Sequence, residues 1–460
     1  MGRRAGALSL ALFLLASCSV DTPGRGLPTQ GSGDATESCP GMAVQPAADR
    51  PVIDLRFELD EDGRTVTGTE KVRFTPDLTT DELVFRLTAN QPLSVAAGSG
   101  IEIGDVTGDD VAAVDFEPAG AAEATQGGLL VVRLEGDLRP GQSTEVGIEF
   151  QLRLGLGTFD RFGHDAQTSW WGSGHPLLAW EPGHGWHREP LLETLGETAT
   201  SPAAQTTLSV LVPAGRTVLM TGGATAVEAD DRLTLWRSTT PAARDVSVAV
   251  GDFTLAEEIV GQTRLIVGAS PQQAGPLLDQ VRVALVALEE YLGPFPFDTL
   301  SVARLDDYGG GIEYPAMILL AGGGDVVITH EIAHMWFYGM VGDNQAGDPW
   351  LDEAFATYAE GLVTGPPEDP AQALAEPLDV GLPIGEFPST EAYLDTVYGK
   401  GSAMLDLARS ESGPELFDAA LRCYLNANAW RIAKPTDVEA ALRELPAALA
   451  VLREAGALPG

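Results

Sequence analysis

Basic residues are scarce in this sequence. Its 460 residues include 28 Lys and Arg against 66 Asp and Glu, which gives a net charge of −38. A surface this acidic repels the phosphates of nucleic acids and does not attract anionic lipid headgroups. We therefore expect no nucleic-acid partner and no charge-driven binding to membranes. Hydrophobic residues make up 44% of the chain, which indicates globular structure, and the length suggests two or three domains.

The apolar stretch near the N-terminus is too short to span a bilayer. It covers residues 7–15 and follows two arginines, a pattern typical of a signal peptide. Leu15-Ala16-Ser17-Cys18 resembles the lipobox of bacterial lipoproteins, in which cleavage exposes a cysteine that is then acylated. We therefore predict a signal peptide over 1–17 and an exported, cell-envelope lipoprotein that reaches the membrane only through a lipid anchor at Cys18. A plain secreted protein is the alternative.

Cysteine is rarer still, with three in the chain. Apart from Cys18, only Cys39 and Cys423 remain. An oxidising compartment would permit a disulfide between them, but the sequence does not show that they meet. The sequence is equally compatible with Cys39 and Cys423 as two unpaired thiols.

The composition changes along the chain and suggests its division. Residues 18–47 are dense in Gly, Pro and small polar residues, which predicts a flexible linker behind the lipid anchor. Residues 48–257 contain short alternating apolar and polar runs broken by Asp, Gly and Pro, which predict an N-terminal domain of antiparallel strands. The predicted strands are 52–59, 65–74, 83–87, 128–134, 145–152, 205–212, 233–236 and 246–253.

Residues 258–460 have the periodicity of a different, more helical domain. Apolar residues recur at steps of three and four from Leu277 to Leu292 and predict a helix that ends at Gly293-Pro294. Residues 297–305 read as a strand. Further helical patterns cover 405–409, 415–425 and 436–445, and the last should begin with a capping box from Thr436 to Glu439.

Four histidines and four tryptophans gather between positions 164 and 189. No pair of these histidines has the spacing of metal ligands on one helix or strand. We therefore interpret this passage as aromatic packing rather than as a second metal site.

The two histidines beyond this passage are His330 and His334, in the run His330-Glu331-Ile332-Ala333-His334. In a helix, residues four apart project from one face, so these imidazoles can bind one zinc ion. Glu331 can then act as the general base for a zinc-activated water. An ordinary pair of partly buried histidines on an amphipathic helix is the alternative.

Glu353 follows His334 after 18 intervening residues. Residues 341–349 between them are rich in turn formers, and a second helical run covers 350–362. A helix, a loop and a helix can bring Glu353 back to the histidine pair as a third ligand. Three protein ligands leave a tetrahedral zinc ion one open position, which a catalytic site requires.

Further motifs flank this candidate site. They are Gly310-Gly311-Ile312-Glu313-Tyr314, Trp350-Leu351-Asp352-Glu353 and Tyr398-Gly399-Lys400-Gly401. Together with the histidine run and its spacing to Glu353, they resemble the aminopeptidase N family of zinc metallopeptidases, gluzincins that include the leukotriene epoxide hydrolase. The resemblance covers about residues 285–425. It implies a multidomain α+β fold, in which the antiparallel β domain precedes a thermolysin-like zinc-peptidase domain with a short helical C-terminal tail.

The resemblance also implies roles for particular residues. His330, His334 and Glu353 would hold one zinc ion as the cofactor, and Glu331 would be the base of an aminopeptidase acting on peptide substrates. Glu313 would bind the α-amine of the substrate.

Two further roles concern the peptide backbone and the oxyanion. Gly310 and Gly311 would line the substrate, and Tyr398 would donate a hydrogen bond to the oxyanion. From the residues alone, a core tyrosine on a helix is the alternative for Tyr398, and Glu360 could orient a zinc ligand or lie in solvent.

The sequence also departs from the family. Ile312 and Tyr314 replace its usual methionine and asparagine, and Ala354 replaces a glycine after the third ligand. We expect this chain to lack the large C-terminal helical domain, which would leave a more open cleft. An endopeptidase, an epoxide hydrolase or a non-catalytic zinc-containing surface protein therefore remain alternatives.

Overall fold

The computed structural model describes residues 39–157, 161–192, 199–305, 310–322, 324–366 and 369–459. The predicted signal peptide and the predicted anchor at Cys18 lie outside these residues. Among the helices of the described residues, none has both the length and the apolar character that crossing a membrane requires.

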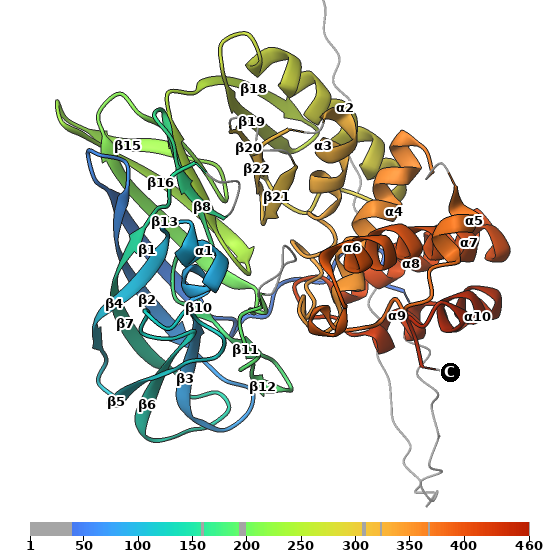
Figure 1. The fold of residues 1–460 in the computed structure, drawn as a ribbon, viewed down its shortest axis with the longest axis horizontal. Helices are drawn as coiled ribbons and strands as arrows, with labels where there is room; N and C mark the ends of the chain where they lie inside the picture. Colours follow the sequence, from blue (N-terminus) through green and yellow to red (C-terminus); the bar gives the residue numbers. More distant parts are fainter. Residues whose placement is uncertain are drawn as a thin grey trace, which may run out of the picture. The chain divides into compact units, whose positions relative to one another are not determined.

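The N-terminal half consists of β-sheets, as the alternating runs predict (Figure 1). Every second side chain is buried in β1 (Val52–Leu59) and β2 (Thr65–Phe74), which lie within a sheet of order β15-β16-β13-β1-β2-β7-β4. Neighbouring strands in this sheet are antiparallel except β1 and β13, because the long chain between them allows a crossover. The other strands are β15 (Thr225–Ala229), β16 (Leu233–Ala243), β13 (Ala204–Pro213), β7 (Thr144–Arg153) and β4 (Gly100–Thr107).

Two smaller sheets and a hairpin complete this half in the described residues. Their orders are β10-β3-β6-β5, β14-β17-β9-β8 and β11-β12. Trp170 and Trp171 on β9 are fully buried, and the Trp171 ring lies 5.6 Å from that of Phe57. The passage rich in histidine and tryptophan therefore packs, as expected. The strands are β3 (Thr80–Arg86), β5 (Val111–Glu117), β6 (Leu129–Leu138), β8 (Phe162–His164), β9 (Thr168–Gly172), β10 (Leu177–Leu178), β11 (Trp180–Glu181), β12 (Gly185–Trp186), β14 (Thr217–Met220) and β17 (Ser247–Gly251); η1 (Thr88–Asn90) and α1 (Pro92–Ala96) are short helices.

The second half begins with a mixed sheet of order β18-β19-β20-β22-β21. Its strands are β18 (Thr254–Val260), β19 (Thr263–Ala269), β20 (Thr299–Arg304), β21 (Gly311–Tyr314) and β22 (Met317–Leu320). β18 pairs with β19, so this sheet spans the boundary expected near residue 257. Helix α2 (Ala274–Leu292) packs against β18 and β19 and ends at Gly293, whose φ is +95°, as the sequence predicts.

The remaining helices surround the candidate zinc run. They are α3 (Gly324–Ala333), η2 (Pro349–Leu351), α4 (Glu353–Thr364), α5 (Pro370–Leu374), η3 (Ile384–Glu386), α6 (Thr390–Tyr393), the π-helix η4 (Leu394–Lys400), α7 (Gly401–Ser412), α8 (Pro414–Asn428), α9 (Pro435–Ala441) and α10 (Pro446–Glu454). The predicted capping box is wrong by two residues. Pro435 begins α9, so Lys434 is the N-cap and its N–H donates to Asp437 Oδ2 at 2.8 Å.

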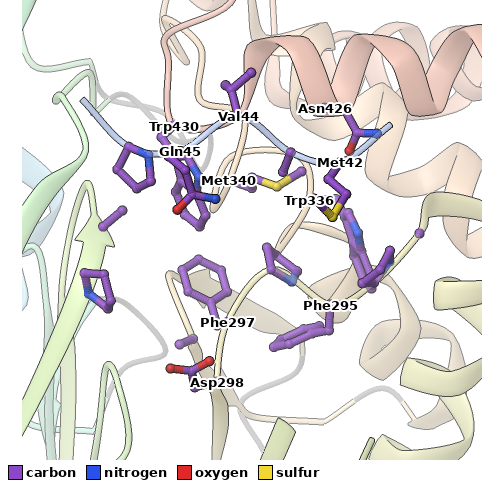
Figure 2. Close-up of a pocket in the computed structure, with 18 of the residues that line it drawn as sticks. Met42, Val44, Gln45, Phe295, Phe297, Asp298, Trp336, Met340, Asn426 and Trp430 are labelled. Carbon is purple, nitrogen blue, oxygen red and sulfur yellow. The ribbon is translucent and has the colours of Figure 1, made fainter. Parts of the chain in front are cut away.

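The first described residues are fixed to α8. Cys39 and Cys423 form a disulfide, with 5.2 Å between their Cα atoms, and the Val44 N–H donates to the Asn426 carbonyl at 3.0 Å. Residues 41–46 also line a cavity of about 510 Å³ with aromatic walls (Figure 2). The labelled aromatic residues are Phe295, Phe297, Trp336 and Trp430.

A network of charged side chains joins the two halves. His187 bonds Glu181 through Nε2 at 2.6 Å and Glu189 through Nδ1 at 2.7 Å. The other oxygen of Glu181 pairs with Lys434 Nζ at 2.7 Å, and Glu189 Oε1 accepts from Asn344 at 3.3 Å. The network thus connects the end of the β half with α9 and with the loop before α4.

This network predicts a pH-dependent contribution to stability. Burial opposes a charge on His187, but its hydrogen bonds to the two glutamates outweigh burial and raise its pKa to about 9. Since folding raises this pKa, the contribution is complete below pH 6.5 and is lost as the pH rises through 9. We expect His187→Phe to lower the Tm, with a smaller deficit above pH 9 than at pH 6.5. Thermal unfolding checks this.

His184→Phe is the matched control, because His184 stacks on the His187 ring with 4.6 Å between centroids. An equal Tm deficit of His187→Phe at both pH values would contradict the ionic role.

Candidate active site

The three predicted metal ligands converge between α3 and α4. Nε2 of His330 and Nε2 of His334 lie 3.0 Å apart, and each lies 3.3 Å from Oε2 of Glu353. An ion with bonds of about 2.0–2.1 Å to tetrahedral ligands separates those ligands by about 3.3 Å. Glu353 Oε2 is buried and has no hydrogen-bond partner among the described residues. Both the size of the triangle and its donor set therefore fit one zinc ion.

Each imidazole is held through its second nitrogen. His334 Nδ1 donates to Asp352 Oδ1 at 2.5 Å, and His330 Nδ1 lies 3.4 Å from Glu360 Oε2. These contacts leave the Nε2 lone pairs for the metal. Glu360 is thus placed as a partner of a ligand rather than in bulk solvent.

Asp352 and Gln345 complete an arrangement that the sequence did not reveal. Gln345 Nε2 donates to Asp352 Oδ2 at 2.9 Å, and Gln345 Oε1 accepts from the Ala199 N–H at 3.1 Å. The adjacency of Asp352 to Glu353 was the available signal. Gln345 gave none, because it lies in a loop whose course the sequence does not define.

The charges of the site alter its acid–base properties. Burial opposes a charge on His330, but the adjacent carboxylates of Glu353 and Glu360 outweigh it and raise the pKa of His330 to about 9. Burial raises the pKa of Glu331 to about 7, although the two histidines oppose this rise. A carboxylate whose pKa lies near neutrality suits a general base that takes and returns a proton.

Glu331 packs against the backbone of β21. It is 4% exposed, and its Oε2 has no hydrogen-bond partner among the described residues. A Cβ added at Gly311 would lie 2.5 Å from Glu331 Cδ. Gly311 therefore leaves room for the carboxylate, in addition to the substrate contact expected of it.

Gly311→Ala is expected to displace the Glu331 carboxylate and to lower kcat/KM roughly 10- to 100-fold, because small misplacements of a reacting group are costly. The zinc content should stay at the wild-type level. The control is Gly261→Ala, at a position where a Cβ would meet nothing within 4 Å. Its φ of +60° makes that substitution a test of backbone strain alone. Wild-type kcat/KM in Gly311→Ala would disprove the steric role.

Glu313 lies on the same face of β21 as Gly311, since alternate residues of a strand share a face. Glu313 is 4% exposed, and one of its carboxylate oxygens lies within 4.8 Å of a ring nitrogen of His334 and of an oxygen of Asp352. Burial raises the pKa of Glu313 to about 8, which the positive charge of His334 opposes. Gly310 precedes the strand with a φ of +84°. β21 is an edge strand of its sheet in the described residues.

Tyr398 lies in the π-helix η4 and packs against the metal triad, the three converging residues His330, His334 and Glu353. Its ring stacks on that of His330, with 5.9 Å between centroids and 15° between planes. Burial and the charge of Glu353 raise its pKa well above the ordinary value. The phenol therefore stays protonated and can donate a hydrogen bond to a developing oxyanion.

Two departures from the family motifs have local explanations. Tyr314 fills space beside β9, where a Cβ at Gly172 would lie 2.1 Å from its hydroxyl. Ala354 packs against α7, where a Cβ at Gly401 would lie 2.6 Å from the Ala354 Cβ. Neither departure changes one of the three converging ligands or Glu331.

Comparison with solved structures finds this fold in an M1 zinc metallopeptidase of Deinococcus radiodurans. The TM-score is 0.64 at 19% identity, over 89% of this chain and 93% of that chain. A mutant of an M1 zinc metallopeptidase from that organism, bound to a Tyr-Ser-Ala substrate, gives a TM-score of 0.64 at 18% identity, over 88% of this chain and 94% of that chain.

Comparison of sequences points the same way over shorter segments. The chain is 26% identical over 241 residues to aminopeptidase M1-A of Oryza sativa subsp. japonica, which covers 43% of this chain and 27% of the relative. It is 31% identical over 137 residues to human glutamyl aminopeptidase, which covers 26% of this chain and 14% of the relative. These matches thus span about a quarter or less of the relatives' length. No protein-family model matches. The chain has the fold of the M1 zinc metallopeptidases, and the resemblance to the aminopeptidase N family that its motifs indicate is confirmed.

Proposed function

We propose that this chain is a zinc-dependent aminopeptidase that removes N-terminal residues from peptides. The observation that carries the proposal is the convergence of a three-ligand metal triad, a buried general base and a second buried carboxylate in one site. When bound there, zinc would polarise the scissile carbonyl and make a water molecule more acidic.

Residues of the chain carry out the proton transfer, the stabilisation of the oxyanion and the binding of the substrate amine. Glu331 takes a proton from the attacking water and returns it to the leaving amine. Tyr398 donates a hydrogen bond to the carbonyl oxygen as that oxygen gains negative charge. Glu313 pairs with the α-ammonium of the substrate, which favours the ionised carboxylate and opposes the effect of burial on its pKa.

The named relatives support this proposal. The matched curated proteins are aminopeptidases, and one structural neighbour was solved with a tripeptide substrate. Exopeptidase action follows from Glu313, since a fixed carboxylate beside the zinc selects peptides by their free ammonium.

A panel of aminoacyl-coumarin substrates, with free and N-acetylated amines, tests the proposal. We expect the free amines to be cleaved, N-acetylation to abolish cleavage and a zinc chelator to stop the reaction. Equal cleavage of free and acetylated peptides would favour an endopeptidase. Epoxide hydrolysis without peptide cleavage would favour the alternative hydrolase, and zinc binding without hydrolysis would favour a non-catalytic surface protein.

We also propose that the protein is exported and anchored through Cys18. The signal-peptide pattern supports export, and the Cys39–Cys423 disulfide is of a kind that persists in oxidising compartments. Detergent-phase partitioning should retain the wild-type chain and release Cys18→Ala into the aqueous phase. Aqueous partitioning of both would disprove the anchor.

A further inference from the structure

Four aromatic rings form a row that ends at a zinc ligand. The centroids of Phe387 and Tyr393 lie 5.4 Å apart, those of Tyr393 and Tyr398 5.7 Å, and those of Tyr398 and His330 5.9 Å. The first two pairs meet edge to face, with planes at 65° and 88°, and the last pair is stacked at 15°. Such contacts fix rings in both position and tilt.

Tyr393 is the most deeply buried of the three rings that precede His330 in this row. Phe387 is half-buried, Tyr393 is 2% exposed, and Tyr398 is partly exposed. The ring with the least freedom to move therefore lies behind the one whose hydroxyl has to meet the substrate. His330 is held on the far side by its contacts with Glu353 and Glu360.

The π-helix is what brings the two tyrosines together. Tyr393 ends α6, and Tyr398 lies five positions later, within η4. In an α-helix, a five-residue step turns by about 140° and would place the two side chains on different faces. In a π-helix, hydrogen bonds run from residue i to residue i+5, so a residue and the one five positions later lie near each other on successive turns. The irregular turn thus has a defined consequence for the site.

We propose that Tyr393 is a positioning residue, whose ring holds the Tyr398 phenol against His330 and so aims the Tyr398 hydroxyl at the substrate oxygen above the metal triad. This inference rests on the proposed function, because the Tyr398 hydroxyl is positioned to stabilise the oxyanion that forms in peptide hydrolysis. Tyr393 is not among the converging metal ligands, and the role proposed for it is exerted through Tyr398.

A role of Tyr393 in core packing alone would have different consequences for its substitution. Tyr393 belongs to the apolar core of the second half. A core residue would cost stability whatever occupies position 398, whereas a positioning residue loses its effect on turnover once the Tyr398 hydroxyl is gone. The dependence of one substitution on the other therefore separates the two roles.

The experiment is a double-mutant cycle on the zinc-loaded full chain. Tyr393→Leu removes the ring contact, and Tyr393→Phe keeps it. Each is made alone and together with Tyr398→Phe, and kcat and KM are measured on an aminoacyl-coumarin substrate.

Tyr398→Phe should lower kcat about 10²- to 10³-fold, as loss of an oxyanion donor does. Tyr393→Leu should lower kcat roughly 10- to 100-fold with little change in KM, since the loss concerns geometry in the transition state. Tyr393→Phe should stay within about twofold of wild type, because the ring contact remains. In the Tyr398→Phe background, Tyr393→Leu should cost little more.

Three outcomes would overturn the proposal. The first is an equal loss from Tyr393→Leu in both backgrounds, which would assign it to general packing. The second is a loss from Tyr393→Phe as large as that from Tyr393→Leu. The third is an unchanged kcat in Tyr398→Phe, which would remove the role of Tyr398 while leaving a zinc peptidase.

A readout without turnover keeps the test independent of the proposed function. With 3-fluorotyrosine at position 398 of the metal-free chain, we expect one narrow ¹⁹F resonance in the wild type. Tyr393→Leu should broaden or shift it, and Tyr393→Phe should restore it. An inactive wild type with this pattern would refute the aminopeptidase and support the positioning role, whereas an unaltered resonance in Tyr393→Leu would refute the positioning role.

Discussion

Glu331→Gln is expected to bind zinc normally and to lose about 10³-fold or more in kcat, the scale of a general base in acyl transfer. Glutamine keeps the shape of the side chain but cannot take a proton from water. Because Glu331 is not among the three converging ligands, its replacement leaves the metal triad intact. Zinc content by mass spectrometry and kcat on an aminoacyl-coumarin substrate check both parts.

The matched comparison is Glu353→Gln, which alters a carboxylate of the same site. Its Oε2 lies 3.3 Å from the Nε2 atoms of both histidines, so this variant should lose zinc together with activity. Glu331→Gln should separate the two properties. Hydrolysis by Glu331→Gln at the wild-type rate would refute the proposed mechanism.

The metal triad was the part of the site most open to prediction from sequence. His330 and His334 are four residues apart, so helical periodicity alone places them on one face. The prediction of Glu353 as the third ligand required only that the chain return to the histidines after a loop. The structure adds the atoms: one carboxylate oxygen lies 3.3 Å from both imidazoles.

Relations between distant segments could not be predicted from sequence. Gly311 matches a family motif, but its contact with Glu331 depends on how β21 packs against α3. The pairing of Cys39 with Cys423 was left open, because it depends on where the first described residues lie on α8. Local patterns specify neighbours along an element, whereas tertiary packing decides which elements meet.

The π-helix shows the same limit within a single segment. The sequence from Leu394 to Lys400 gave no sign of a hydrogen-bonding pattern other than that of an α-helix. Tyr398 could be selected from its motif, but Tyr393 could not, since an ordinary helix would place it on another face.

Asp352→Asn is expected to weaken zinc binding by about 10- to 100-fold, the usual cost of losing a hydrogen-bond partner of a histidine ligand. The directions of the hydrogen bonds explain why an amide fails. Asp352 accepts from His334 Nδ1 at one oxygen and from Gln345 Nε2 at the other. Gln345 cannot reverse its amide without losing the bond that its oxygen accepts from the Ala199 N–H. In Asp352→Asn, the side-chain NH₂ group therefore faces an N–H donor, either that of His334 or that of Gln345.

A graded series tests this chain of bonds. Gln345→Met keeps the length of the side chain but makes no hydrogen bond to Asp352, so it should weaken zinc binding less than Asp352→Asn does. Asp348→Asn, in the same loop, should leave the zinc affinity unchanged and serves as the control. Chelator competition measures the Kd. If Asp352→Asn bound zinc as tightly as the wild type, the orientation of His334 would have to come from packing alone. In that case the link through Gln345 to Ala199 would join the two halves without serving the metal.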